Sequence, residues 1–190
     1  MLESKQIIKI DGKNVFLEVL NSAFEIGKVQ INFFEYDISK DKGERIRNEI
    51  SIYVSMDKFL VLSNDVLSGR ISALATKARV EQQNGGYKYC KEIWTDLGGV
   101  SAELLKKRDK ERADGKSLSR QMKLTPGDKL PWIFSAESGP GELIETGLII
   151  PRYSGNKPEA VVRVPMTNDD LKRMVLIVKA HIEGYLVSQY

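Results

Sequence analysis

The sequence predicts an α+β protein built of two repeats, each an antiparallel sheet followed by a helix, with the helices covering one face of the sheets. Two stretches, "ISIYVSMDKFLVLSNDVL" (50–67) and "VRVPMTNDDLKRMVLIV" (162–178), both read as an alternating strand, a helix start and an apolar helix. Short alternating runs between Gly and Pro signals precede each stretch, as in antiparallel meanders. We expect one domain of two repeats, residues 1–86 with an N-terminal extension and residues 87–190.

The strands of the first repeat are predicted from period-2 alternation. "QIIKI" (6–10) reads as a short strand, and "KVQINFFEYD" (28–37) and "RIRNEISIYV" (45–54) alternate over their whole lengths. Between them, the apolar residues of "NVFLEVLNSAFEIG" (14–27) recur at helical spacing, so we expect a helix that ends at Gly27.

The second repeat shows short runs of the same kind. "YKYCKEIWTDLGG" (87–99) mixes aromatic and basic residues and predicts a strand, and "GPGE" (139–142) predicts a loop between later strands. "EAVVRVP" (159–165) predicts the last strand, and its helix starts with Thr167 followed by Asp170, as in a capping box. The helix of the first repeat has Ser55 as its cap and can break at Ser68-Gly69.

The basic residues of the chain are concentrated in one segment. Residues 103–123 contain eight bases and four acids, a charge of +4, whereas the whole chain carries +3. A local excess of this kind is typical of a surface for a polyanion, and its alternative is a solvated connection of mixed charge.

Several function classes are disfavoured. The aliphatic run "MVLIV" (174–178) is far too short for a membrane span, and the N-terminus lacks the apolar segment of a signal peptide, so we expect a soluble, cytoplasmic protein. The single Cys90 excludes an internal disulfide and a multi-cysteine metal site. His181 lacks a nucleophile motif, and "NDD" (168–170) reads as a helix start rather than as metal carboxylates. We therefore expect no catalytic residue, no metal and no cofactor.

A polar and aromatic sheet face remains as the candidate site. Aromatic rings stack on unpaired bases while Lys and Arg contact phosphates, so this combination favours single-stranded nucleic acid. The candidate nucleic-acid-binding residues are Lys28, Gln30, Asn32, Phe34, Tyr36, Arg47, Tyr53, Tyr89, Lys91, Lys106, Lys107, Arg108, Gln121, Lys123, Trp132 and Arg163. Structural roles stay open: Phe34 can pack under a helix, Trp132 can belong to the core, and Arg47, Lys123 and Arg163 can be solvated sheet charges.

The layout resembles the Whirly-like superfamily of single-stranded-nucleic-acid-binding proteins, which includes the transcriptional coactivators related to positive cofactor four. The resemblance covers residues 28–190 and rests on the strand–cap–helix repeat and on "RQMKLTPGDKLPWIFSAESGPGELIETGLIIP" (120–151). The Whirly-type motif "KGKAAL" is absent, and "GKSLSRQMKL" (115–124) is its nearest counterpart. The resemblance implies binding of single-stranded DNA or RNA on the sheet surface, no enzymatic activity, and assembly through the helices into dimers or tetramers.

We therefore expect a non-enzymatic protein that binds single-stranded DNA or RNA, acts in DNA replication, recombination, transfer or transcription, and forms a homo-oligomer. The alternative is a protein-interaction or scaffold module that uses the exposed sheet face. A third option, a nuclease or annealing enzyme, would require a carboxylate cluster on that face.

Overall fold

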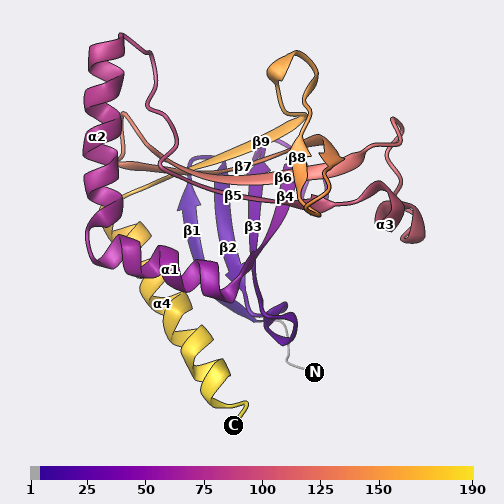
Figure 1. The fold of residues 1–190 in the computed structure, drawn as a ribbon, viewed down its shortest axis with the longest axis horizontal. Helices are drawn as coiled ribbons and strands as arrows, with labels where there is room; N and C mark the ends of the chain where they lie inside the picture. The colour runs from indigo at the N-terminus through magenta and orange to yellow at the C-terminus, as the bar shows by residue number, and fades with distance from the viewer. Residues whose placement is uncertain (1–4) are drawn as a thin grey trace.

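The computed structural model describes residues 5–190; residues 1–4, which begin the predicted first repeat, lie outside the described residues. The first half of the chain forms a four-stranded antiparallel sheet, sheet A, followed by two helices (Figure 1). Its strands pair in chain order, and the elements are β1 (Gln6–Gly12), β2 (Val15–Leu20), the 3-10 turn η1 (Phe24–Ile26), β3 (Lys28–Tyr36), β4 (Ile46–Ser55), α1 (Met56–Leu67) and α2 (Arg70–Gly85).

The second half forms a five-stranded antiparallel sheet, sheet B, followed by one long helix. Strands pair in the order β5-β6-β7, and both β8 and β9 pair with β7, each along a different part of it. The elements are β5 (Trp94–Val100), α3 (Ala102–Lys107), β6 (Ser117–Pro126), β7 (Trp132–Leu143), β8 (Ile149–Pro151), the turn η2 (Ser154–Asn156), β9 (Ala160–Met166) and α4 (Asn168–Val187).

The apolar faces of the two sheets meet in a shared core. The strands of sheet B cross those of sheet A (Figure 1), and the fully buried rings of Phe33 and Phe134, one from each sheet, lie 5.8 Å apart between centroids. α1 and α4 pack against each other, and their buried side chains join the same hydrophobic cluster. The predicted fold class, α+β with two sheet-plus-helix units, is confirmed.

The helix predicted over residues 14–27 is wrong, because this segment forms β2 and η1. β2 lies between β1 and β3 and is hydrogen-bonded to both, which satisfies its backbone on two sides. Leu17 and Val19 are buried while Phe16 and Glu18 face outward, so the segment alternates as a strand after all. Gly27 ends η1 in the left-handed conformation, at φ 67°.

Two boundaries in the second half also differ from the prediction. Residues 87–93 precede β5 and are not part of a strand, so Tyr89 and Lys91 stand on a loop. The predicted "GPGE" loop (139–142) belongs to β7, where Gly139 and Gly141 pair with β6. At Gly141 a Cβ would approach Ser119 Cβ and Ile149 within 3 Å, so close packing explains why glycine stands inside this strand.

The helix termini follow the predicted signals. The break between α1 and α2 falls at Gly69, which adopts φ 83°. Thr167 and Asp170 form the predicted capping box at the start of α4, with both reciprocal hydrogen bonds present. Ser55 occupies the N-cap position of α1, but its hydroxyl makes no capping hydrogen bond.

Candidate functional site

The predicted site residues do not form one surface. Because the inner faces of the two sheets share the core, the outer faces of sheets A and B point to opposite sides of the molecule. Gln30, Phe34 and Tyr53 lie on the outer face of sheet A, whereas Lys123 and Arg163 lie on the outer face of sheet B. Apart from Trp132, which is buried between the sheets, the candidates therefore separate into these two faces, with the loop that borders sheet B, and a third region around α3.

The amide side chains on the outer face of sheet A form a hydrogen-bonded chain. The Ser22 hydroxyl donates to Gln30 Oε1 at 2.5 Å, and Gln30 Nε2 donates to Asn32 Oδ1 at 2.9 Å. Asn32 Nδ2 then donates to Glu18 Oε1 at 3.1 Å, and Asn32 is only 6% exposed. These amides hold one another in place, so Asn32 offers little surface to a ligand.

An aromatic stack lies on the same face. The rings of Phe16 and Phe34 are stacked with centroids 4.6 Å apart, and Tyr36 lies 5.9 Å from Phe16. Lys9 Nζ lies 4.3 Å from the centroid of the Phe16 ring, a cation–π contact. Phe34 is therefore packed against a neighbouring strand rather than under a helix. Phe16 was missed as a candidate because its segment was predicted to be a helix.

Tyr53 and Arg120 stand where β4 meets β6. Tyr53 is 45% exposed and lies across from Gln30, while Arg120 is partly buried and forms no ion pair within residues 5–190. Burial lowers the pKa of Arg120, and the positive charge of Arg108 lowers it further. Glu49 is also within electrostatic reach of the guanidinium. We call Tyr53, Arg108 and Arg120 the Arg120 cluster; the sequence analysis included its first two members and missed Arg120.

Arg47, the remaining candidate on β4, is tied to an acid. Its guanidinium contacts Asp37 at 2.5 Å. The pKa of Asp37 is lowered to about 2, first by the hydrogen bonds from Ser39 and then by Arg47. Arg47 is exposed, but its ion pair with Asp37 makes it a weaker candidate for binding a phosphate than a basic side chain that has no acidic partner.

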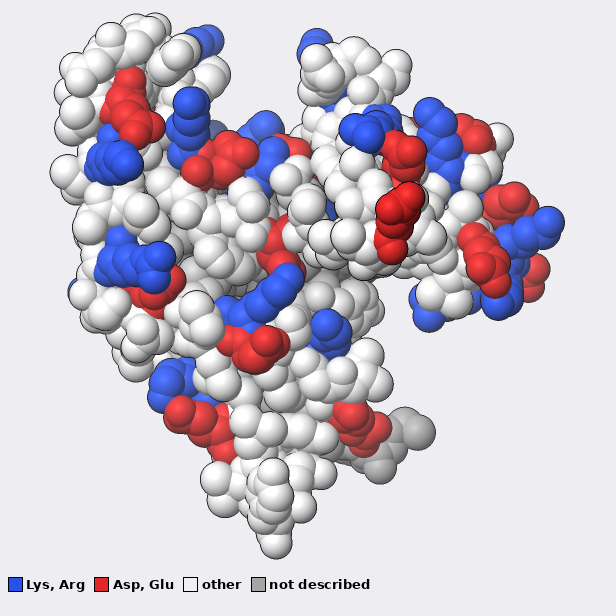
Figure 2. All heavy atoms as spheres, viewed as in Figure 1, with Lys and Arg blue, Asp and Glu red and all other residues white. Residues whose placement is uncertain are grey.

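In the folded protein, acidic side chains lie among the basic side chains of the region around α3. Lys107 pairs with Glu103 at 2.7 Å, whereas Lys106 and Arg108 are exposed and have no ion-pair partner within the described chain. On the face seen in Figure 2, Lys and Arg side chains are interspersed with Asp and Glu, including over the region of α3. On this face the segment does not form a continuous cationic patch.

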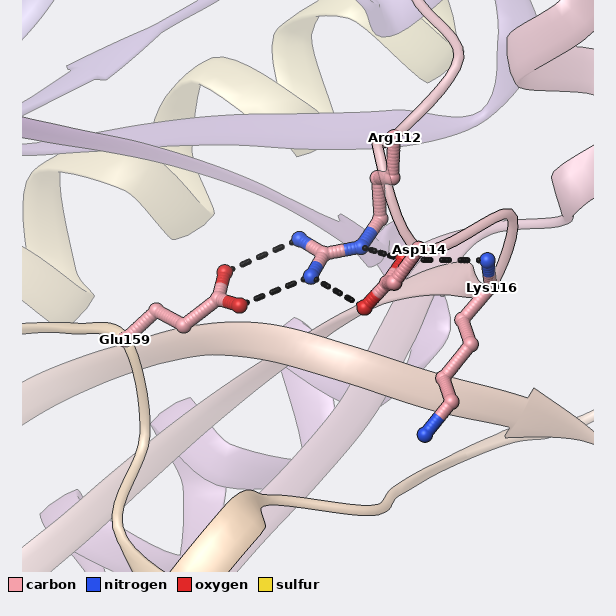
Figure 3. Close-up of polar contacts among 4 residues, drawn as sticks. All are labelled: Arg112, Asp114, Lys116 and Glu159. Atoms are coloured by element: carbon pink, nitrogen blue, oxygen red, sulfur yellow. Dashed lines mark hydrogen bonds and ion pairs between the residues drawn. The ribbon is translucent and has the colours of Figure 1, made fainter.

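Arg112 in this region has a structural role. Its guanidinium binds Glu159 at 2.9 and 2.8 Å and Asp114 at 3.0 and 2.9 Å, so both carboxylates face it (Figure 3). The hydrogen bonds to Glu159 and Asp114 raise the pKa of Arg112. The Arg112 side chain is 16% exposed and ties the loop after α3 to the start of β9.

A groove lies on the outer face of sheet B and has a volume of about 550 Å³. Lys123 on β6 and Arg163 on β9 both line it, with Ser135 of β7 between them in register. Lys123 pairs with Glu137 at 2.9 Å, and Tyr89 from the loop before β5 borders the groove. Gln121 lies on the same sheet face, and Lys91 of the loop approaches the ring of Tyr87 at 5.8 Å.

Trp132 is not available to a ligand. The side chain is 5% exposed, belongs to the shared core, and donates its indole N–H to Asn168 Oδ1 at 2.8 Å. The prediction that Trp132 binds nucleic acid is therefore wrong, and the alternative role in the core is the correct one. Its position opposite Pro126 and Met166 puts it on the inner face of β7, where aromatic side chains fill the space between the sheets.

The other reactive side chains have structural contacts. His181 Nδ1 lies 2.8 Å from the carbonyl oxygen of Ile177, and the buried Cys90 thiol donates to Gln82 Oε1 at 2.9 Å. Within residues 5–190, no group of three or more His, Cys, Asp or Glu side chains is placed to hold a metal ion. No helix in this range has the length and apolar character needed to cross a membrane.

No protein-family model matches the chain, and a search of curated proteins found no significant match.

Proposed function

We propose that the protein binds single-stranded DNA or RNA without catalysing a reaction. The observation that carries this proposal is the Arg120 cluster, in which the exposed Tyr53 and Arg108 lie within electrostatic reach of the partly buried Arg120, and neither arginine forms an ion pair within residues 5–190. Both sheet-plus-helix units on which the resemblance to the Whirly-like superfamily rests are present, and membership of that superfamily is part of the proposal.

The physical argument starts from Arg120. A guanidinium keeps its charge at neutral pH, and a partly buried charge without a counter-ion is destabilising. Glu49 acts on Arg120 from a distance but forms no ion pair with it within residues 5–190, so a phosphate would supply a direct counter-ion and could accept two parallel hydrogen bonds. Tyr53 presents a ring on which an unpaired base can stack, whereas a paired base inside a duplex is not accessible to it. Single strands therefore fit the cluster better than duplexes.

Fluorescence anisotropy with labelled single-stranded DNA and RNA tests the proposal. We expect affinity that falls as salt rises, because phosphate contacts release counter-ions, with a log–log slope of about −0.7 for each contact. Arg120→Gln is expected to weaken binding and to make the slope less negative by about 0.7, the contribution of one phosphate contact. Lys77→Gln, an exposed charge on α2, is the control and should change neither quantity.

The result that contradicts the proposal is equally clear. If no single-stranded oligonucleotide binds, or if affinity is the same at low and high salt, the function is not nucleic-acid binding. The alternative of a protein-interaction module would then be favoured by a purified protein that carries no nucleic acid, judged by absorbance at 260 and 280 nm, and captures one defined polypeptide.

A further inference from the structure

We propose that the groove on the outer face of sheet B, which we call the sheet B groove, holds one unpaired nucleotide and prefers a base that carries an exocyclic amino group. This inference rests on the proposed function and adds a base preference to it. Its volume of about 550 Å³ falls in the range of small-ligand sites.

The floor of the groove is fixed by strand pairing. Lys123, Ser135 and Arg163 form one row across β6, β7 and β9, so the two cations stand two strands apart, about 10 Å at the usual strand spacing. One wall is the loop before β5, which is anchored where Ile93 N–H donates to the Leu124 carbonyl and where Cys90 contacts Gln82. The site is therefore built on regular elements and a tethered loop.

The charges in the groove define what it can accept. Lys123 and Glu137 neutralise each other at 2.9 Å, whereas Arg163, the second cation lining the groove, has no ion-pair partner within residues 5–190. Glu92 and Asp128 also line the groove, are exposed, and have no ion-pair or hydrogen-bond partner within residues 5–190. Two free carboxylates would repel a bare phosphate, so the ligand must bring hydrogen-bond donors as well as an anion.

A nucleotide meets both requirements. Its phosphate can pair with Arg163, and its base can stack on Tyr89, which is 63% exposed at the groove edge. Carboxylates accept hydrogen bonds from the amino group of cytosine, whereas thymine presents a carbonyl oxygen at the equivalent position. Glu92 and Asp128 therefore favour cytosine over thymine, two pyrimidines that differ little in stacking surface.

The test compares deoxycytidine and deoxythymidine oligonucleotides of equal length by anisotropy at one salt concentration. We expect the cytidine strand to bind about tenfold more tightly, the effect of one good carboxylate–amino contact. In the double variant Glu92→Gln, Asp128→Asn, this ratio should fall toward one while overall affinity rises, because two negative charges are removed near the phosphates.

Two controls separate this inference from the proposed function. Glu145→Gln removes an exposed acid outside the groove and should leave the cytidine-to-thymidine ratio unchanged. Arg120→Gln, on the other side of β6, should lower both affinities and preserve the ratio. Equal binding of the two strands by the unaltered protein, or a ratio that the double variant does not change, overturns the groove inference while the proposed function stands. If neither strand binds, both are rejected.

Discussion

The contrast between Tyr53 and Trp132 shows what decides whether an aromatic residue can bind a ligand. Both stand on strands and both were candidates, yet Tyr53 is 45% exposed on an outer face and Trp132 is 5% exposed between the sheets. The hydroxyl group of Tyr53 is not needed for stacking, because the ring supplies the surface that a base covers.

Substitution of Tyr53 separates the ring from the hydroxyl. Tyr53→Ala is expected to weaken single-strand binding by about 1–3 kcal/mol, the usual contribution of one stacked base, whereas Tyr53→Phe should keep most of the affinity. Tyr190→Ala removes an exposed ring at the C-terminal end and serves as the control. Anisotropy titrations give these values, and a loss in the Phe variant as large as in the Ala variant would contradict the stacking role.

Alternation along a strand predicts which residues share a face. It does not predict which positions along that face are covered by the other sheet. Lys123 and Arg163 lie opposite the buried Leu124 and Val164, as period-2 alternation requires. The same rule places Arg120 on the face of Met122 and Leu124, which indicates a core position. Arg120 lies instead where sheet B meets the edge strand β4 and is only partly buried. Its exposure depends on how far sheet B extends past sheet A, which the sequence pattern of one strand does not reveal.

At the scale of elements, the sequence correctly predicted those features that depend on contacts between residues close together in the chain. The capping box of α4 and the glycine between α1 and α2 act within a few residues, so the sequence was sufficient to predict them. β2 was missed because Val15, Phe16, Val19 and Leu20 also fit helical spacing. Its strand conformation is selected by hydrogen bonds to β1 and β3, which no local pattern reveals.

The Arg112 tie between the loop after α3 and β9 gives a pH prediction. Hydrogen bonds, chiefly from Arg112, lower the pKa of Asp114 to about 2. Since the folded-state pKa lies below the ordinary 3.8, the stabilisation is present above that pH and is lost as the pH falls toward 2. NMR titration of the Asp114 carboxyl should show its midpoint rise toward the ordinary value in Arg112→Gln. Asp37, whose low pKa depends first on Ser39, should not move; a similar rise at Asp37 would indicate general unfolding.

At the scale of the whole molecule, the two repeats form two sheets that share one hydrophobic core and are not two independent domains. Each sheet has one apolar face, and a sheet of this kind must cover that face to be stable. Here the two sheets cover each other, with α1 and α4 completing the cluster, so the outer faces are separated by the full thickness of the core. The sequence predicted the apolar faces, whereas their mutual packing, and hence the separation of the candidate residues, depends on contacts between distant segments.

This shared core predicts that the two halves unfold together. Phe33 of β3 is fully buried against Phe134 of β7, so Phe33→Ala is expected to cost about 3–5 kcal/mol. The chain has two tryptophans, Trp94 and Trp132, and both stand on strands of sheet B and contact the shared core, so their fluorescence reports the unfolding of sheet B and of that core. In urea, the fluorescence midpoint and the far-ultraviolet circular dichroism midpoint should both fall and should coincide, although the substitution is in the first half. A fluorescence midpoint that stays at its original value while the dichroism midpoint falls would show that sheet B keeps its fold without sheet A.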